Sequence, residues 1–145
     1  MDHILCLRSN QSDLYYPNNT PYHFKIFLNK PLFLEGDWQI ALLDFYSEEK
    51  ISVSKKNRHE LYIFCDACMG VNISNNQFSL LRRIFPTPDK TWNYIFSTPV
   101  YYLPVKKNEI RELEFHIKDE NGQDATFLKQ PLSCTVHFKP YKHVN

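Results

Sequence analysis

Glycine is scarce in this sequence, with three residues among 145, set against nine prolines. Three scattered glycines cannot form the glycine-rich loop by which many nucleotide-binding proteins hold phosphate groups, so that kind of site is excluded. Most turns must instead be made by Pro, Asn, Asp and Ser, which favour turns through a restricted φ angle or through side-chain hydrogen bonds to the backbone.

An excess of charge of one sign is also missing, because 17 basic residues face 16 acidic ones and the net charge is +1. This balance gives no indication of a strongly basic nucleic-acid-binding surface or of an acidic tail. Three basic pairs stand near tyrosines that could stack on bases: Lys55-Lys56, Arg82-Arg83 and Lys106-Lys107. Because they are spread evenly along the chain, we interpret them as solubilising charges and expect no specific nucleic-acid partner.

Long hydrophobic runs are absent, and no segment approaches the roughly 18 apolar residues that a membrane-spanning helix needs. The first residues, MDHILCLR, carry an acid at position 2, and their apolar run stops at Leu7. This is not the pattern of a secretory signal peptide. We therefore expect a protein without a membrane span, made in a reducing compartment, with four free cysteines.

One cysteine pair, Cys65 and Cys68, has the spacing of a zinc knuckle or a redox motif. A structural zinc ion needs two more ligands, and no second pair of this spacing occurs. Cys6 and Cys134 each stand alone on a predicted strand. The incomplete ligand set favours small buried thiols over a metal site, and we expect no metal and no cofactor.

The histidines and carboxylates do not form a recognisable catalytic motif. His23, His116 and His137 fall on the predicted outer faces of strands, where they would meet solvent or a partner subunit. The acidic residues could in principle serve a glycosidase or bind calcium. They alternate with apolar residues or lie in a turn, which is typical of a solvated strand face: Glu109, Glu112, Glu114, Asp119, Glu120 and Asp124. We expect no catalytic residues.

What the sequence does contain is aromatic residues, 15% of the chain, in short runs that alternate between apolar and polar. Such alternation predicts strands with one buried face. The expected strands are His3–Arg8, Tyr22–Leu28, Trp38–Tyr46, Leu61–Cys65, Trp92–Val105 (broken by Pro99 and Pro104), Arg111–Lys118, Ala125–Phe127 and Leu132–Phe138.

Three of these segments carry further expectations. Trp38–Tyr46 is apolar at both alternating positions, which predicts a strand covered on both faces. Asp119–Gly122 predicts a hairpin turn, since Asn-Gly tolerates positive φ, and Asn72–Gln77 also has turn composition. Gln77–Phe85 fits a capped helix or a strand ending before Pro86, and the residues alone leave that choice open.

About eight short strands and no clear long helix indicate an all-β sandwich or barrel. Long loops between strands favour a single jelly-roll β-sandwich of antiparallel strands over a simple meander, in one domain spanning residues 1–145. We expect these residues to form the core: Trp38, Ile40, Leu42, Phe115, Ile117, Val136 and Phe138. Three polar loops are candidates for partner contact: Ser9–Thr20, Ser47–Glu60 and Pro86–Lys90.

Several segments, in order and spacing, resemble one family. Phe33–Leu42, FLEGDWQIAL, resembles an L-x-G-x-W-x-V-A-L signature, and Pro99–Val105, PVYYLPV, is similar to a P-x-Y-x-P-V step. Leu61–Asp66 with Leu80–Arg82 resembles the middle of the family, and Glu112–Phe138 its closing hairpin. The family is the minor capsid (penton) protein of Polinton/Maverick elements and their adintovirus-like relatives.

The likeness runs from about Asn18 to Lys139 and has two departures. The last motif has Val136 and Lys139 where the family has Leu and Arg, and Leu128–Pro131 stands where a Gly is usual. Both changes keep the apolar face of the hairpin. The resemblance also favours a strand for Gln77–Phe85.

What the resemblance implies is a structural virion protein without an active site. Such a protein would be a single jelly roll that forms homopentamers at the vertices of an icosahedral capsid and contacts a double jelly-roll major capsid protein. It would be assembled inside the host cell and reside in the virion. The alternative is a non-capsid jelly-roll module, lectin-like or receptor-binding, whose surface aromatics stack on sugars. A cupin-type enzyme is a third possibility, but it needs clustered histidines.

Overall fold

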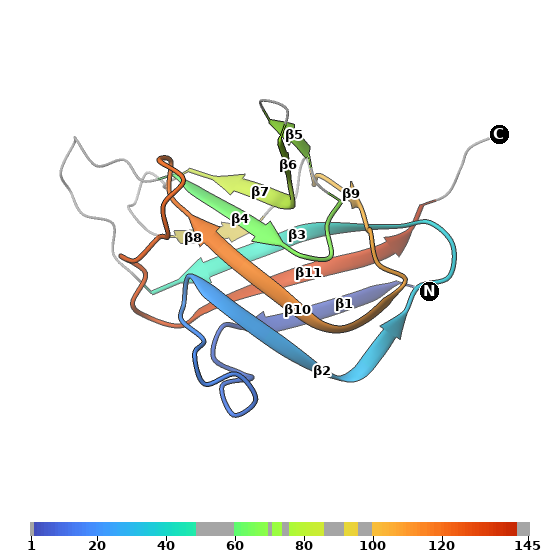
Figure 1. Ribbon diagram of the computed structural model, residues 1–145, viewed down its shortest axis with the longest axis horizontal. Helices are drawn as coiled ribbons and strands as arrows, with labels where there is room; N and C mark the ends of the chain where they lie inside the picture. The colour runs from blue at the N-terminus through green and yellow to red at the C-terminus, as the bar shows by residue number, and fades with distance from the viewer. Residues whose placement is uncertain are drawn as a thin grey trace.

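Two antiparallel β-sheets, packed face to face, make up the computed structural model, which describes residues 2–48, 60–69, 71–73, 76–85, 92–95 and 100–141 (Figure 1). The strands are β1 (His3–Arg8), β2 (His23–Phe33), β3 (Trp38–Ser47), β4 (Leu61–Cys65), β5 (Val71–Ile73), β6 (Asn76–Phe78), β7 (Leu80–Ile84), β8 (Trp92–Ile95), β9 (Leu103–Pro104), β10 (Glu109–Lys118) and β11 (Leu132–Pro140). The expected all-β sandwich is confirmed.

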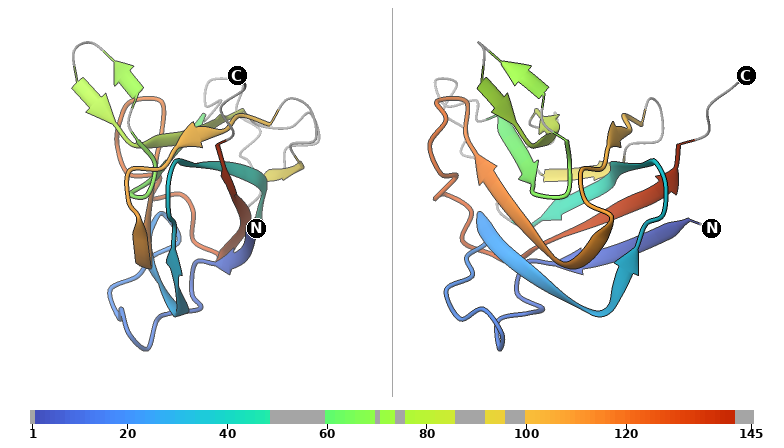
Figure 2. Two further views of the ribbon diagram at one scale, coloured as in Figure 1. Left: turned by 90° about the vertical axis from the view of Figure 1, so that its right-hand side faces the viewer. Right: turned by 45° about the vertical axis from the view of Figure 1, so that its right-hand side comes forward.

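Each sheet combines strands that are far apart in sequence. Sheet A has the order β1-β11-β3-β8, with the short β9 also paired to β3, and sheet B has the order β2-β10-β4-β7. The left view of Figure 2 shows the layers, with β2 and β10 on one side and β3 and β11 on the other. The hairpin of β5 and β6 stands apart from both sheets. The described residues include no helix, and hence no helix long and apolar enough to cross a membrane.

The core lies between the sheets and follows the alternation of the sequence. In β10, Leu113, Phe115 and Ile117 are buried, as expected. In sheet B, Phe115 is the register partner of Phe24, and their rings stack at a centroid distance of 5.2 Å. The expected core residues are confirmed as buried except for Trp38, which is only partly buried and packs at the margin of the core.

The expectation that Trp38–Tyr46 is covered on both faces holds only around Ala41, which is fully buried on the opposite face from Ile40 and Leu42. The register between β3 and β11 shifts at Leu43, because Val136 pairs with Leu42 whereas Thr135 pairs with Asp44. This β-bulge reverses the alternation, so that Ile40 and Leu42 face the core before the bulge and Phe45 and Ser47 face it afterwards. After the bulge only the core face is buried, and Tyr46 on the outer face is 44% exposed. Apolar residues therefore occupy both alternating positions mainly because the alternation reverses.

The ambiguous segment Gln77–Phe85 contains the edge strand β7, so the helical alternative is wrong. The strand conformation is decided by pairing with Leu61–Phe64 of β4, a long-range contact that the local sequence does not reveal. Within Asn72–Gln77, which has turn composition, residues 72–73 and 76–77 belong to the paired strands β5 and β6, and residues 74–75 lie outside the described part.

The predicted turn at Asp119–Gly122 is confirmed. Gly122 has φ of +76°, and the N–H of Gln123 donates to Asp119 Oδ1 at 3.0 Å. The expected return strand Ala125–Phe127 does not form, because pairing stops at a single bridge between Lys118 and Asp124. The chain then turns, and Ala125 and Leu128 are buried in the core instead.

The predicted strand Trp92–Val105 is divided into β8 and β9, and Pro104 ends β9 at the margin of sheet A. A proline has no N–H to donate to a neighbouring strand, so it is tolerated at such a position. Pro99, the loop Pro86–Lys90 and nearly all of Ser47–Glu60 lie outside the described residues.

The core assignment of the last strand can be tested with two phenylalanines. Phe138 is fully buried between the sheets, whereas Phe33 is 67% exposed. Replacing Phe138 by Ala should lower the free energy of unfolding by about 3–5 kcal/mol through lost packing and a residual cavity. Phe33→Ala is the matched control and should change it by less than about 1 kcal/mol. Equal chemical denaturation midpoints for the two variants would show that the core is assigned wrongly.

Candidate functional site

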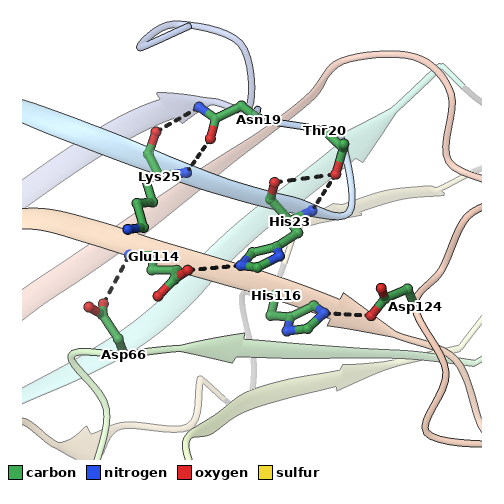
Figure 3. Close-up of polar contacts among 8 residues, drawn as sticks. All are labelled: Asn19, Thr20, His23, Lys25, Asp66, Glu114, His116 and Asp124. Atoms are coloured by element: carbon green, nitrogen blue, oxygen red, sulfur yellow. Dashed lines mark hydrogen bonds and ion pairs between the residues drawn. The ribbon is translucent and has the colours of Figure 1, made fainter. Parts of the chain in front are cut away.

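A pair of stacked histidines lies on the outer face of sheet B. His23 of β2 and His116 of β10 are register partners, and their ring centroids are 4.3 Å apart with an interplanar angle of 8°. His23 Nε2 lies 2.8 Å from Glu114 Oε2, and His116 Nε2 lies 2.6 Å from Asp124 Oδ1. Figure 3 shows the two carboxylates on opposite sides of the stack.

The surrounding backbone holds this pair in place. The N–H of His23 donates to Thr20 Oγ1 at 3.0 Å, which fixes the start of β2. The N–H of Glu114 donates to Asp66 Oδ1 at 3.0 Å, and the other oxygen of Asp66 lies 2.8 Å from Lys107 Nζ (Figure 3 shows the first of these contacts). The carboxylate that faces His23 is therefore positioned by the turn after β4 as well as by β10.

Two hollows meet at this pair, and both are lined by His23 and Glu114. One, of about 390 Å³, lies against the loop Ser9–Thr20, and the other, of about 350 Å³, lies toward Lys106. Both are open to solvent, and the His23 side chain is 45% exposed. Neutral imidazoles form hydrogen bonds to these carboxylates and protonated ones form ion pairs, so the arrangement is suited to polar recognition at a surface.

The third outward-facing histidine belongs to sheet A and is largely covered. The Tyr102 hydroxyl lies 2.8 Å from His137 Nδ1, and Asp2 Oδ2 lies 2.9 Å from His137 Nε2. Lys139 Nζ lies 3.9 Å from the centroid of the Tyr102 ring, a cation–π contact. The His137 side chain is only 14% exposed, so it supports the position of Tyr102 more than it meets solvent.

The loop Ser9–Thr20, a candidate for partner contact, runs along β2, which is the edge strand of sheet B (Figure 1). Asn19 Nδ2 donates to the carbonyl of Lys25 at 3.0 Å, and the N–H of Lys25 donates to Asn19 Oδ1 at 2.9 Å. The N–H of Phe27 donates to Ser12 Oγ at 2.9 Å. The loop thus satisfies backbone N–H and C=O groups at the edge of sheet B, with which another strand could otherwise pair.

A tyrosine attaches the middle of this loop to sheet B. The Tyr16 hydroxyl donates to Glu112 Oε2 at 2.6 Å, and this hydrogen bond to a carboxylate, aided by partial burial, raises the pKa of Tyr16 to about 12. Glu112 is among the acids predicted to lie on a solvated strand face, and here it serves as the anchor of a loop.

Three apolar side chains are presented by the anchored loop and the strand beside it. Leu14 is 99% exposed and Tyr15 is 62% exposed. The Tyr15 ring stacks on that of Phe27 at 4.5 Å. We call Leu14, Tyr15 and Phe27 the loop patch. Ordered apolar groups with this exposure are typical of an interaction surface.

The four cysteines divide into one accessible thiol and three enclosed ones. Cys6 is exposed, so the expectation that it is a small buried residue is wrong, because it lies on the outer face of β1. Cys65, Cys68 and Cys134 are buried, and burial raises the pKa of all three, to about 11 for Cys68 and about 12 for Cys134. Among the described residues, no three His, Cys, Asp or Glu side chains converge to hold a metal ion.

Sequence reasoning placed His23 and His116 on outer faces but did not bring them together. Their stacking depends on the β2–β10 register, and these strands are separated by most of the chain. The edge-covering role of Asn19 and Ser12 was also missed, although a polar loop rich in Asn and Ser is a signal for side-chain capping of backbone groups. Comparisons of the whole chain with protein-family models and with curated proteins find no match.

Anchoring of the loop can be tested with adjacent asparagines. Asn19→Ala removes two hydrogen bonds to Lys25 and should lower the free energy of unfolding by about 1–2 kcal/mol. Asn18→Ala, at an exposed neighbouring position, should have little effect. The Lys25 amide hydrogen should exchange faster in Asn19→Ala than in the parent protein, whereas in Asn18→Ala it should exchange at the parent rate. Unchanged exchange at Lys25 would contradict the edge-covering role.

The thiols predict a definite pH dependence. At neutral pH a thiol reagent should modify Cys6 in the folded protein, because the other three thiols are buried. Above the ordinary thiol pKa of 9.0, the unfolded chain loses protons that folded Cys134 retains up to about pH 12. The free energy of unfolding should therefore fall as pH rises through this window.

The matched variants are Cys134→Ala and Cys6→Ala. The first should reduce the alkaline slope of the unfolding free energy, measured by chemical denaturation across pH. The second should reduce it far less, because burial is the main cause of the raised pKa of Cys134 and the neighbouring Cys6 is a minor one. Rapid modification of Cys134 in the folded protein would contradict its burial.

Proposed function

We propose that this chain is a structural virion protein of the penton type, a single jelly roll that forms pentameric vertices of an icosahedral capsid. The observation that carries the proposal is the strand order of the two sheets. With the short strands β5, β6 and β9 set aside, sheet A joins the first, eighth, third and sixth strands, and sheet B joins the second, seventh, fourth and fifth. This order is compatible with a jelly roll, an architecture common in viral capsid proteins, and it supports the proposal.

The motif resemblance supports the same proposal, because its segments occupy structural elements of this sandwich. The signature Phe33–Leu42 spans the turn from β2 into β3, where Gly36 has φ of +84°. The segment Glu112–Phe138, which resembles the closing hairpin of the family, forms no hairpin here; it supplies β10 to the middle of sheet B and β11 to the middle of sheet A. The resemblance thus covers residues that build both layers.

In this proposal the subunits of the ring contact one another through side-chain surfaces. A cyclic oligomer needs two different complementary surfaces on each subunit, so that each copy contacts two neighbours. The loop patch supplies one exposed apolar surface beside an edge that is already covered. Its partner in this proposal is another copy of the chain, with a double jelly-roll major capsid protein surrounding the ring.

A non-capsid binding module remains the competing proposal, because lectins and cupins share jelly-roll architecture and a fold alone does not determine function. A lectin-like module would act as a monomer or a small oligomer through a sugar site. The two proposals therefore differ in the mass of the purified protein.

Light scattering coupled to size-exclusion chromatography provides the test. A penton-type protein should elute as a particle of about five times the chain mass of 17.3 kDa. Leu14→Glu should shift that mass toward the monomer without changing the melting temperature, because Leu14 is fully exposed. Ile4→Glu, at another exposed apolar position on the outer face of β1, is the control and should preserve the particle. A monomer at all concentrations, also in the presence of a co-expressed major capsid protein, would overturn the proposal.

A further inference from the structure

The outer face of sheet A carries two rows of polar side chains across three strands. Register places Arg8 of β1, Ser133 of β11 and Tyr46 of β3 in one row. Cys6, Thr135 and Asp44 form the next row. Figure 1 shows the three strands side by side. The β3 bulge at Leu43 turns Asp44 and Tyr46 outward, and without it both would face the core.

These rows line a hollow of about 540 Å³, together with Gln11 from the loop that follows β1. Its volume lies within the range of roughly 300–1,000 Å³ that is usual for small-molecule sites. The hollow lies on the opposite sheet from the histidine pair and the loop patch. It is therefore a separate surface, and its role does not depend on the assembly proposed above.

Several polar groups in the hollow have no partner within the described part of the chain. The Asp44 carboxylate is half-buried in the middle of a strand and makes no hydrogen bond or ion pair there. The exposed Arg8 guanidinium is likewise unpaired. Gln11 accepts from the Arg8 N–H at 2.6 Å through Oε1, which leaves its NH₂ group unbonded. A half-buried carboxylate without a partner is costly unless water or a ligand satisfies it.

The remaining lining favours a ligand with both apolar and hydroxyl surfaces. Tyr46 exposes 44% of its surface and offers the face and edge of an aromatic ring. Ser133 contributes a hydroxyl, and Thr135 directs its own toward Cys6 Sγ at 3.9 Å. The ionised Asp44 carboxylate accepts hydrogen bonds and donates none, whereas the Arg8 guanidinium donates them and accepts none. Opposite charges on these two residues leave the hollow without net charge.

We propose that this hollow binds a neutral saccharide. A pyranose ring presents C–H groups that pack on an aromatic ring and hydroxyls that both donate and accept. In this assignment Asp44 accepts from a pair of sugar hydroxyls, Arg8 and Gln11 donate to sugar oxygens, and Tyr46 packs against the C–H face. A single ring buries little surface, so binding is weak and gains strength when many copies act together.

The test is a titration of the full chain with methyl glycosides of glucose, galactose and mannose and with N-acetylglucosamine, followed by amide NMR. At least one of these sugars should shift the amides of Arg8, Tyr46 and Ser133. Asp44→Asn should weaken that sugar about ten- to a hundredfold, because a charged acceptor is lost with little change in shape. Tyr46→Ala should weaken it by a similar factor.

Two variants serve as matched controls. Asp13→Asn in the loop that follows β1 and Tyr101→Ala elsewhere change the same residue types at exposed positions outside the hollow and should leave the affinity unchanged. Amide spectra of each variant report whether the fold is intact. The proposal is overturned if no sugar shifts the amides of the hollow, or if Asp44→Asn and Tyr46→Ala bind as well as the parent. It is also overturned if only N-acetylneuraminic acid binds and only Arg8→Gln abolishes that binding, since the site would then be an anion site.

Discussion

The apolar layer between the two sheets is the constraint on which the rest of this structure depends. Four strands, β2, β3, β10 and β11, place large side chains there, among them the fully buried Phe24, Phe45, Phe115 and Phe138. Burial of each such side chain contributes on the order of 1.5–3 kcal/mol, far more than any exposed polar contact. Because each sheet turns one face toward this layer, the core also decides which residues face outward.

The outer faces show what this constraint allows. On sheet B, cross-strand register brings two histidines into contact and leaves each beside a carboxylate. On sheet A, one β-bulge changes which residues of β3 face solvent and places Asp44 and Tyr46 beside Arg8 and Thr135. A change of register by one residue would disrupt the histidine pair and the hollow and would also expose the core. Both surfaces therefore depend on correct folding of the sheets.

Edges of sheets are a second constraint, because unpaired backbone groups attract other strands. The loop Ser9–Thr20 covers the β2 edge with side-chain hydrogen bonds and at the same time presents Leu14 and Tyr15 outward. Contacts at this margin must then use side chains, whose shape and charge can distinguish one partner from another. A subunit of a closed ring and a binding module both need that property. The mass of the particle tests the first, and the sugar titration tests the second.

The sequence alone determined most of the strands and most of their inner faces, because alternation is a local property and apolar side chains are buried whichever strands become neighbours. The all-β class, the turn at Asp119–Gly122 and nearly all of the expected core followed from that pattern. Only the tertiary structure decided the bulge at Leu43, the failure of Ala125–Phe127 to pair, the meeting of His23 with His116, and the row in which Ser133 lies between Arg8 and Tyr46. These features depend on which strands become neighbours and in what register, and that choice is made by packing across the whole domain between residues that no local window contains.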